Sequence, residues 1–416
     1  MLIIGVIKCK QKKVGLSLTS AFKETMNYVF FSPHFPSNFQ YFVKALAERG
    51  VTVLGIGPVE RWELTPILQR ALTDYVKVSD LENYDYVYRS VAYLISVYGR
   101  IDRFESHNEH WLEQDARIRT DFNIPGLNAD EAQKIKRKSI MKRVFRKLDL
   151  QVADGAVITS LQHAKDLASS IGYPVLVKPD KGVGATYTYK LDNEAQLIEF
   201  YRNKPPLEFI LEEFIDAPIE TFDGLVDQHG KLVFTNSFVY NSGVMDLVNK
   251  GLDMYYYTRR IIPKDLEVIG KSLVKAFKLR ERFFHFEFFR LPEGSLVALE
   301  INVRPPGGLS MDMFNFANDE DFFGAYADVV IGRPVKYRNA RPYHVIYIGL
   351  KNHHLDHLAI PLEDSLKQLK DHVVYDGPVP DIFSAAMGNR AIMLRHPDEA
   401  WLLDATHRLM NLKSST

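Results

Sequence analysis

Residues 282–308, RFFHFEFFRLPEGSLVALEINVRPPGG, constrain the fold more than any other part of this chain. Their alternation of apolar and polar residues predicts two antiparallel strands joined by a turn at residues 292–294. One face of this hairpin is apolar and carries Phe284, Phe286, Phe288, Val297, Leu299, Ile301 and Val303. We expect that face to pack into a core, as one face of an antiparallel sheet commonly does.

The opposite face gathers polar groups at one end. The register set by the turn places Glu287 opposite Glu300. It also places His285 opposite Asn302, and Arg304 follows on the same face. Two opposed carboxylates repel each other, and a divalent cation would relieve that repulsion. Two carboxylates and an amide oxygen suit Mg²⁺ or Mn²⁺ better than Zn²⁺. The alternative is an ordinary hairpin whose acids pair with nearby lysines.

A second stretch, YPVLVKPDKGVGATYTYKL at residues 173–191, has the pattern of a buried strand that ends in Lys178. The loop that follows contains Gly182, Gly184 and Thr186. Small residues let backbone amides approach a phosphate closely, and hydroxyl groups add donors. The loop matches neither the Walker A pattern nor the GxGxxG pattern. The alternative is a surface hairpin with a solvated lysine.

A third stretch, FILEEFIDAPIE at residues 209–220, predicts a strand followed by an acidic linker. The strand ends in Glu212, Glu213, Phe214 and Ile215, and Glu220 follows a short turn. Free backbone groups in such a linker can bind an adenine edge, and a carboxylate can hold ribose hydroxyls. The alternative is a solvated acidic turn.

Residues 134–147, KIKRKSIMKRVFRK, form a strongly basic segment. It predicts a nucleic-acid patch, a helix that faces a polyphosphate or, for most of its residues, a solvated helix face. Two histidine groups have spacings that could bind a metal, namely His107 with His110, and His353, His354 and His357. Neither group has an HExxH motif or a cysteine set, so we expect both to be structural.

The remaining pattern predicts several domains. Strand–helix alternation over residues 1–126 predicts a doubly wound α/β domain with a parallel sheet. Its strand candidates are MNYVFF (26–31), VTVLGIG (51–57) and YDYVYRS (84–90), and FQYFVKALAERG (39–50) is a helix candidate. Residues 127–335 combine helices, strands and hairpins, and residues 336–416 predict a small α+β subdomain.

Composition narrows the class of protein. The 52 basic and 52 acidic residues give no net charge, which argues against a protein that mainly coats nucleic acid or a membrane. The lone cysteine, Cys9, cannot form an intramolecular disulfide, as expected in a reducing compartment. The chain has neither a secretory signal pattern nor a run of about 18 apolar residues. We therefore expect a soluble, cytoplasmic protein.

The order of these features resembles that of the ATP-grasp superfamily: a helical lysine, a strand lysine, a glycine-rich loop, an acidic linker and a metal hairpin. Glu287 and the sequence from Glu300 to Arg304 resemble its E-x-N-x-R signature and the acidic ligand that precedes it. The resemblance is greatest to carbamoyl-phosphate-synthase-like and biotin-carboxylase-like carboxylate–amine ligases, including L-amino acid ligases. It implies a pre-ATP-grasp domain, a nucleotide-binding lobe at 153–215 and a metal-binding lobe at 216–335.

The resemblance also assigns roles to individual residues. ATP binding is assigned to Lys138, Lys178, Gly182, Gly184, Thr186, Glu212, Glu213, Phe214, Ile215 and Glu220. Lys142 is the alternative to Lys138, because Arg137 replaces the usual aspartate. Metal binding is assigned to Glu287, Glu300 and Asn302, and catalytic contacts with phosphate to Arg304 and Lys178. Backbone groups of Glu213 and Ile215 are expected to bind adenine, and Glu220 the ribose.

The implied enzyme uses ATP and Mg²⁺ to convert a carboxylate into an acyl phosphate, which an amine then attacks. One alternative is a carboxylase or carbamoyl-phosphate-type enzyme that uses bicarbonate, and another is a non-catalytic nucleotide- or nucleic-acid-binding protein. Residues 241–260 are candidates to line the substrate site, with Tyr255–Tyr257 as an apolar wall. Charged substrate contacts are expected from Arg259, Arg260 and His285. We expect small-molecule substrates, no nucleic acid and no membrane, and a homodimer is one expected state because similar enzymes are commonly dimers.

Overall fold

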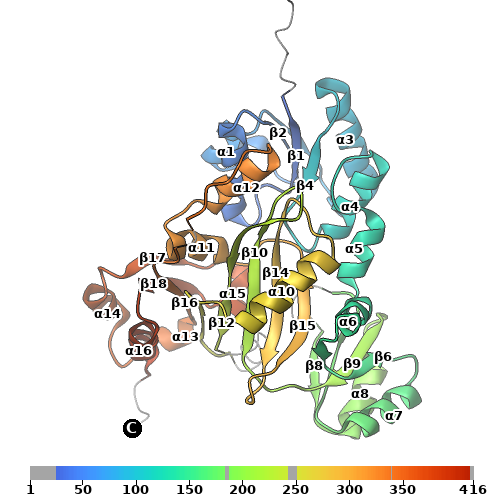
Figure 1. Cartoon of the computed structure of the whole chain (residues 1–416), viewed down its shortest axis with the longest axis vertical. Helices are drawn as coiled ribbons and strands as arrows, with labels where there is room; N and C mark the ends of the chain where they lie inside the picture. Colours follow the sequence, from blue (N-terminus) through green and yellow to red (C-terminus); the bar gives the residue numbers. More distant parts are fainter. Residues whose placement is uncertain (1–24, 183–186, 242–250, 339, 413–416) are drawn as a thin grey trace, which may run out of the picture.

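The computed structural model describes residues 25–182, 187–241, 251–338 and 340–412. Their strands form an N-terminal parallel sheet, a long central sheet and a small antiparallel sheet (Figure 1). No helix in these ranges is long and apolar enough to cross a membrane. The predicted combination of α/β and α+β parts is therefore present.

The N-terminal domain is doubly wound, as predicted. Its strands, in the order β3-β2-β1-β4, are β1 (Asn27–Phe31), β2 (Thr52–Gly57), β3 (Asp74–Lys77) and β4 (Arg103–Glu105). Its helices are η1 (Ser37–Phe39), α1 (Gln40–Glu48), η2 (Arg61–Glu63), α2 (Pro66–Ala71), α3 (Tyr84–Tyr98) and α4 (Leu112–Asp121). Tyr28 and Phe30 pack on the side of α1, and Val29 and Phe31 on the side of α3. Alternating side chains of β1 thus reach two cores, one on each face.

The strand predicted at YDYVYRS is wrong, because this segment begins α3. Asn83 caps the helix by accepting hydrogen bonds from the amides of Asp85 and Tyr86. The buried residues Val87, Ser90, Val91 and Leu94 recur at helical spacing. The third strand of the sheet is instead the short β3, whose residues are half-buried or exposed and therefore lack an apolar signature.

The central sheet runs β17-β18-β16-β13-β12-β10-β14-β15-β5, and β11 pairs with β10. Its central-domain strands are β5 (Gln151–Val152), β10 (Ile219–Val226), β11 (Leu232–Asn236), β12 (Phe238–Tyr240), β13 (Met254–Thr258), β14 (Arg282–Arg290) and β15 (Leu296–Asn302). Helices α10 (Lys264–Ala276), α11 (Ser310–Asn318) and α12 (Phe322–Val330) pack against it. Figure 1 shows α10 across the sheet and α12 beside α1.

The C-terminal residues extend this sheet. Their strands are β16 (His344–Leu350), β17 (Val373–Pro378) and β18 (Arg390–His396). Their helices are α13 (Asn352–Leu355), α14 (Leu362–Gln368), α15 (Asp381–Met387) and α16 (Glu399–Met410). Because β16 pairs with β13, the predicted α+β subdomain is continuous with the central sheet.

The β14–β15 hairpin forms with the predicted pairs Glu287–Glu300 and His285–Asn302. A bulge shifts the register beyond Glu287, and Leu299 is the extra residue. Val297 and Leu299 are therefore not part of the apolar face, contrary to our prediction. Leu296 and Ala298 take their place in that core. The predicted register at the carboxylate end is correct because the bulge offsets the actual position of the turn.

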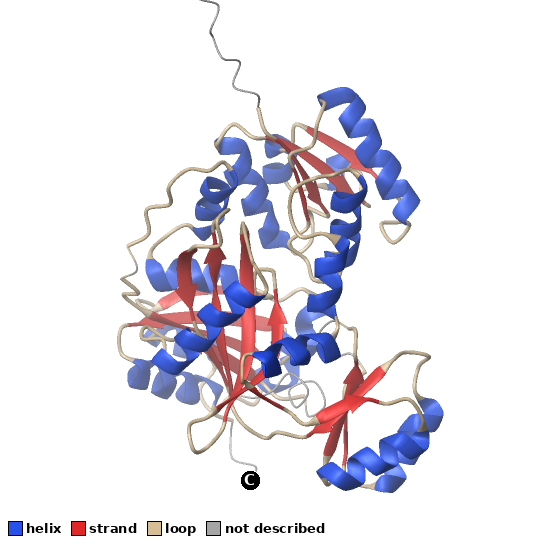
Figure 2. Ribbon diagram, turned by 45° about the vertical axis from the view of Figure 1, so that its right-hand side comes forward, coloured by secondary structure: helices blue, strands red, loops and turns tan. Residues whose placement is uncertain are grey.

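The small lobe forms the sheet β6-β9-β7-β8. It contains β6 (Gly155–Val157), α7 (Leu161–Ile171), β7 (Val175–Pro179), β8 (Tyr189–Leu191), α8 (Glu194–Asn203) and β9 (Phe209–Glu213). Figure 2 shows this lobe standing apart from the central sheet, with both helices on one side. Helices α5 (Ala129–Lys136) and α6 (Lys138–Lys147) connect it to the N-terminal domain.

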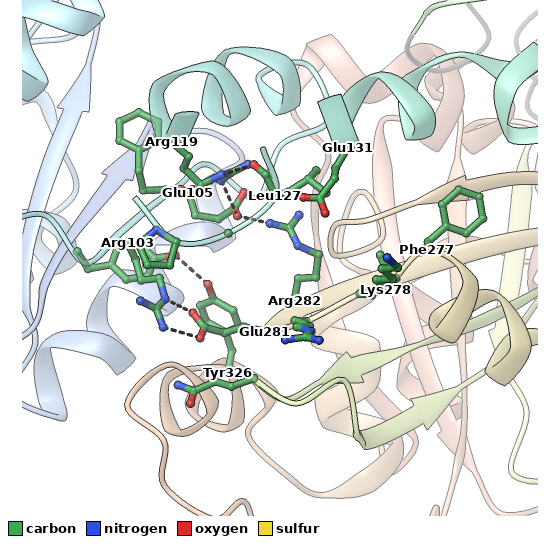
Figure 3. A pocket seen from close by; sticks show the side chains of 17 residues that line it. Arg103, Glu105, Arg119, Leu127, Glu131, Phe277, Lys278, Glu281, Arg282 and Tyr326 are labelled. Atoms are coloured by element: carbon green, nitrogen blue, oxygen red, sulfur yellow. Dashed lines mark hydrogen bonds and ion pairs between the residues drawn. The ribbon is translucent and has the colours of Figure 1, made fainter. Parts of the chain in front are cut away.

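Ion pairs join the N-terminal domain to the central sheet (Figure 3). Arg103 pairs with Glu281, and Arg282 lies 2.7 Å from Glu105. Arg119 also contacts Glu105, at 3.1 Å. These groups border a cavity of about 450 Å³. Because the partners come from different sequence regions, they hold β4 against the start of β14.

Gly270 tests the packing of α10 on the sheet. A Cβ atom at this position would overlap the ring of Phe222 on β10. Gly270→Ala should therefore lower the free energy of unfolding by about 1–3 kcal/mol, although alanine favours a helix by about 1 kcal/mol. Urea unfolding measures the change, and Lys275→Ala, on the exposed side of α10, is the control. Equal stability of wild type and Gly270→Ala would contradict this packing.

Candidate functional site

The paired carboxylates of the hairpin are each held by a different cation. His285 Nε2 lies 3.0 Å from Glu287 Oε1, and Lys138 Nζ lies 3.1 Å from Glu300 Oε1. Burial raises the pKa of Glu287, but the hydrogen bond and charge of His285 outweigh it and lower that pKa overall. Asn302 is 5% exposed, and its side chain has no hydrogen-bond partner among the described residues. Two carboxylates and a free amide therefore lie together at one strand end.

His285 belongs to a buried relay on β10 and β14. Its Nδ1 lies 2.6 Å from Asp223 Oδ1, and Thr221 Oγ1 donates to Asp223 Oδ2 at 2.5 Å. Burial lowers the pKa of His285, but the charges of Asp223 and Glu287 outweigh it and raise the pKa to about 9. We predicted a substrate contact for His285, and both of its ring nitrogens lie against carboxylates of the protein, those of Asp223 and Glu287. The sequence motifs missed Asp223 and Thr221, whose only signal is their cross-strand pairing with β14.

A second buried cluster joins the small lobe to α6. Lys142 Nζ lies 2.5 Å from Glu212 Oε1, and Lys178 Nζ lies 3.0 Å from Glu212 Oε2. Lys142 also donates to Ala153 O at 2.9 Å. Burial lowers the pKa of Lys142, whereas for Glu212 the two lysine charges outweigh burial and lower its pKa. The structure thus groups Lys142 with Lys178, while Lys138 lies with Glu300.

The basic segment divides between this site and the surface. Lys136, Lys138 and Lys142 are buried, and Arg137 lies 2.7 Å from Glu208. The exposed members are Lys134, Arg143, Arg146 and Lys147. A solvated helix face therefore describes only the second group, because α6 turns its other side toward buried carboxylates.

Arg304 contacts a carboxylate of the N-terminal domain. Its Nη2 lies 2.8 Å from Glu109 Oε2, and Lys136 Nζ donates to Glu109 O at 2.9 Å. Burial raises the pKa of Glu109, but the charges of Arg304 and Lys136 outweigh it and lower that pKa. Glu109 matched no sequence motif, so only the folded chain reveals this contact.

A cavity of about 520 Å³ lies beside Arg304 and Glu109. His107 lines it in a left-handed backbone conformation, with φ of 58°. The imidazole is 3% exposed, and its centroid lies 4.5 Å from that of Phe42 and 4.6 Å from that of Tyr326. Burial lowers the pKa of His107 to about 4, so its ring is neutral near pH 7.

The residues predicted to bind ATP in the acidic linker and the glycine-rich loop differ in how the structure places them. The Glu213 amide donates to Asp154 O at 2.8 Å, so this amide is not free for adenine. Lys190 Nζ lies 4.2 Å from the centre of the Phe214 ring, and Ile215 is half-buried. Gly182 is half-buried at the end of a described segment. Gly184 and Thr186 lie outside the described residues.

The predicted ribose and substrate contacts are engaged with other groups. Glu220 is 3% exposed and lies 2.9 Å from both Arg259 and Arg290. Arg260 donates to Arg341 O and Pro397 O, each at 2.8 Å, which links β13 to the C-terminal residues. A substrate role for Arg260 therefore finds no support here.

The tyrosines predicted as a substrate wall lie on β13 and make structural contacts. Tyr255 Oη lies 3.2 Å from His407 Nε2, and Tyr257 donates to Glu399 at 2.9 Å. Tyr256 packs in the core beside Tyr347. Residues 242–250 of the predicted substrate segment lie outside the described ranges.

One histidine of each group contacts a carboxylate of the protein. Among the described residues, no group of three or more His, Cys, Asp or Glu side chains could hold a metal ion. His110 lies 2.5 Å from Glu82, and His354 lies 2.9 Å from Asp253. The Glu287–Glu300–Asn302 set differs from such a group because its third member is an amide.

Comparison with known proteins finds one family model and several distant relatives. Residues 137–233 match the family described as carbamoyl-phosphate synthase L chain, ATP binding domain. An L-arginine-specific L-amino acid ligase of Bacillus subtilis is 23% identical over 232 residues, which are 53% of this chain. The match spans 56% of that relative, little more than half its length.

Two solved structures share the fold. An L-amino acid ligase from Bacillus licheniformis superposes with a TM-score of 0.70 and 15% identity, over 93% of this chain and 97% of that one. The second is the biotin carboxylase domain dimer of the Hydrogenobacter thermophilus 2-oxoglutarate carboxylase, in complex with MgADP, ADP and bicarbonate. It superposes with a TM-score of 0.62 and 16% identity, over 86% of this chain and 83% of that one.

The fold is thus the ATP-grasp fold, with a parallel α/β domain before it. Residues 137–233 are similar to the ATP-binding domain of carbamoyl-phosphate synthase, and the whole chain shares its fold with the solved structures above.

The two α6 lysines should have different effects on nucleotide binding. Lys142→Met should weaken ADP binding without Mg²⁺ by about 10- to 100-fold, because it removes a buried cation beside Lys178. Lys138→Met should mainly change the Mg²⁺ dependence, because Lys138 neutralises Glu300. Calorimetric titration measures both effects, with the exposed Arg143→Met as control. Stronger loss of metal-free ADP binding in Lys138→Met would reverse the assignment.

His107 should make the protein acid-sensitive. Its pKa is about 4 when folded and about 6.5 when unfolded, so the unfolded chain binds the extra proton first. Stability is therefore lost as pH falls from about 6.5 to 4, by about 3 kcal/mol, and the loss levels off below pH 4.

His107→Asn should remove this part of the pH dependence while tolerating the left-handed backbone. Urea unfolding at pH 7, 5.5 and 4 measures how steeply the free energy of unfolding falls with pH. Any stability that the smaller side chain loses at pH 7 shifts the whole curve and does not change this slope. His229→Asn, in the exposed turn after β10, controls for loss of a histidine. Parallel curves for wild type and His107→Asn would rule out this role of His107.

Proposed function

We propose that the protein is an ATP-dependent carboxylate–amine ligase that forms an acyl phosphate and couples it to an amine. The observation that carries this proposal is the convergence of Glu287, Glu300 and Asn302 with Lys138 at the end of one β-ribbon. The buried Lys142–Glu212–Lys178 cluster and the contacts of Arg304 add support. The similarity to amino acid ligases points in the same direction.

The hairpin residues fit Mg²⁺. They provide two carboxylates and an amide that has no partner among the described residues, all with hard oxygen donors. Such sites commonly use one or two carboxylates and complete the coordination with substrate phosphates. Glu287, Glu300 and Asn302 would hold the ion, which would neutralise phosphate charge as the phosphoryl group is transferred.

The protein's own residues position two anions that repel each other. Lys142 and Lys178 would bind the polyphosphate of ATP, and Arg304 would attract the substrate carboxylate. His285 keeps Glu287 ionised and oriented through Asp223. Pre-arranged charges of this kind lower the barrier without reorganising during reaction.

The reaction then proceeds in two balanced steps. A carboxylate oxygen of the substrate attacks the γ-phosphorus, the bond to the bridging oxygen breaks, and ADP leaves. The amine nitrogen attacks the acyl carbon, inorganic phosphate leaves, and the nitrogen loses a proton to give the amide. No protein nucleophile is required, because positioning and charge neutralisation suffice.

Bicarbonate as the phosphate acceptor is the second candidate. The similarity to the biotin carboxylase domain, whose structure contains bicarbonate, favours it. ADP formation that requires bicarbonate and no other acid would support this candidate. A nucleic-acid-binding protein is less consistent with the structure, because three lysines of the basic segment are buried.

The ligase proposal predicts Mg²⁺-dependent hydroxamate formation when ATP, an acid and hydroxylamine are combined. Hydroxylamine traps an acyl phosphate, so the natural amine need not be known. Glu300→Gln and Asn302→Ala should each lower kcat by about 100-fold or more while ADP still binds. Glu293→Gln, in the exposed turn of the same hairpin, is the control. Full activity of both site variants would refute the proposal.

A further inference from the structure

The cavity beside Arg304 has walls from all three parts of the chain. The N-terminal domain contributes Phe35 and Trp111, and the central domain contributes the loop of residues 304–308. The C-terminal residues contribute Phe383, whose ring lies 5.4 Å from that of Phe35 at an interplanar angle of 18°. A volume of about 520 Å³ lies within the range of small-molecule sites.

The walls are mainly apolar. Rings and small apolar residues dominate the lining, including Phe35, Pro36, Phe39, Leu81, Trp111 and Phe383. His107 adds a neutral ring, because burial lowers its pKa to about 4. A substrate side chain enclosed by these groups would lose its contact with water.

The charged lining residues already have partners. Glu109 pairs with Arg304, and His110 contacts Glu82. Away from Arg304, a charged side chain would therefore find no opposite charge among the described lining residues, although a neutral polar group could meet the buried, unpartnered His34 Nδ1 and His107 Nε2. Burial of a charge without such a partner is costly, so this part of the cavity disfavours charged side chains.

The polar end of the cavity includes Arg304, whose charge also acts on Glu287 of the candidate site. Arg304 lines the cavity and follows Asn302 by two residues on the hairpin. Glu109 also lines it and contacts Lys136, the last residue of α5, which lies two positions before Lys138 at the start of α6. A carboxylate bound at Arg304 would thus lie between the apolar cavity and the paired carboxylates of the hairpin.

We propose that this cavity selects carboxylic acids with a bulky apolar side chain, of phenylalanine or leucine size, and holds their carboxyl group at Arg304. The inference rests on the proposed function, because it names the acid that the ligase activates. It also replaces the predicted substrate wall on β13, whose tyrosines make structural contacts.

Hydroxamate formation with a matched set of acids tests the preference for bulky apolar side chains. Phenylalanine, 3-phenylpropionate and leucine should give kcat/KM values at least tenfold above those of alanine, aspartate and lysine, with ATP and Mg²⁺ saturating. The pair phenylalanine and 3-phenylpropionate separates recognition of the side chain from recognition of the amino group. Equal or higher values for the small or charged acids would overturn the proposal.

Two variants change the cavity in opposite directions. A Cβ atom at Gly307 would meet no atom within 4 Å, so Gly307→Leu should fill space without disturbing the fold. It should reduce kcat/KM for phenylalanine at least tenfold and leave KM for ATP unchanged. Phe35→Ala removes one wall and should raise KM for phenylalanine about tenfold with a smaller effect on kcat. Trp62→Ala, at a 75% exposed residue outside the lining, is the control.

Direct binding separates failure of this inference from failure of the proposed function. Calorimetric titration of 3-phenylpropionate should show binding to wild type and loss of binding in Gly307→Leu. That result without turnover of any acid would reject the ligase function and retain the cavity preference. Turnover of small polar acids that neither variant affects would reject the cavity preference and retain the ligase.

Discussion

Two like charges, Glu287 and Glu300, face each other across the β14–β15 ribbon. Their repulsion would destabilise the ribbon if neighbouring cations did not offset it. The neutralising cations come from separate places: His285 from the same ribbon and Lys138 from the start of α6. Because α6 lies between the N-terminal domain and the small lobe, placing Lys138 at Glu300 requires these parts to be packed correctly.

The same principle governs the neighbouring clusters. Glu212 is 1% exposed and would be unstable as an ion without Lys142 and Lys178. Glu109 is likewise buried and depends on Arg304 and Lys136. These carboxylates lie on different domains, yet their partners are mostly on α5, α6 or directly after the β14–β15 hairpin. The helices that connect the domains therefore also supply the charges that hold the candidate site together.

Individual residues show which features the sequence pattern predicted correctly and which it did not. The hairpin and its carboxylate register were predicted because alternation along a strand is a local property. The bulge at Leu299 was not, and it changed which residues form the apolar face. The start of α3 was predicted as a strand, because its tyrosines and valine favour strands while the buried side of the helix appears only after packing.

The sequence by itself determined the order of the domains, most of the strands and the set of polar residues at the hairpin end. Those features depend on short-range alternation and spacing, which a linear sequence records directly. Only the tertiary structure decided that Lys142 joins Lys178, that Asp223 supports His285 and that Glu109 meets Arg304. Each of these contacts joins residues far apart in the chain, and the need to neutralise buried charge selects them only once the domains have packed.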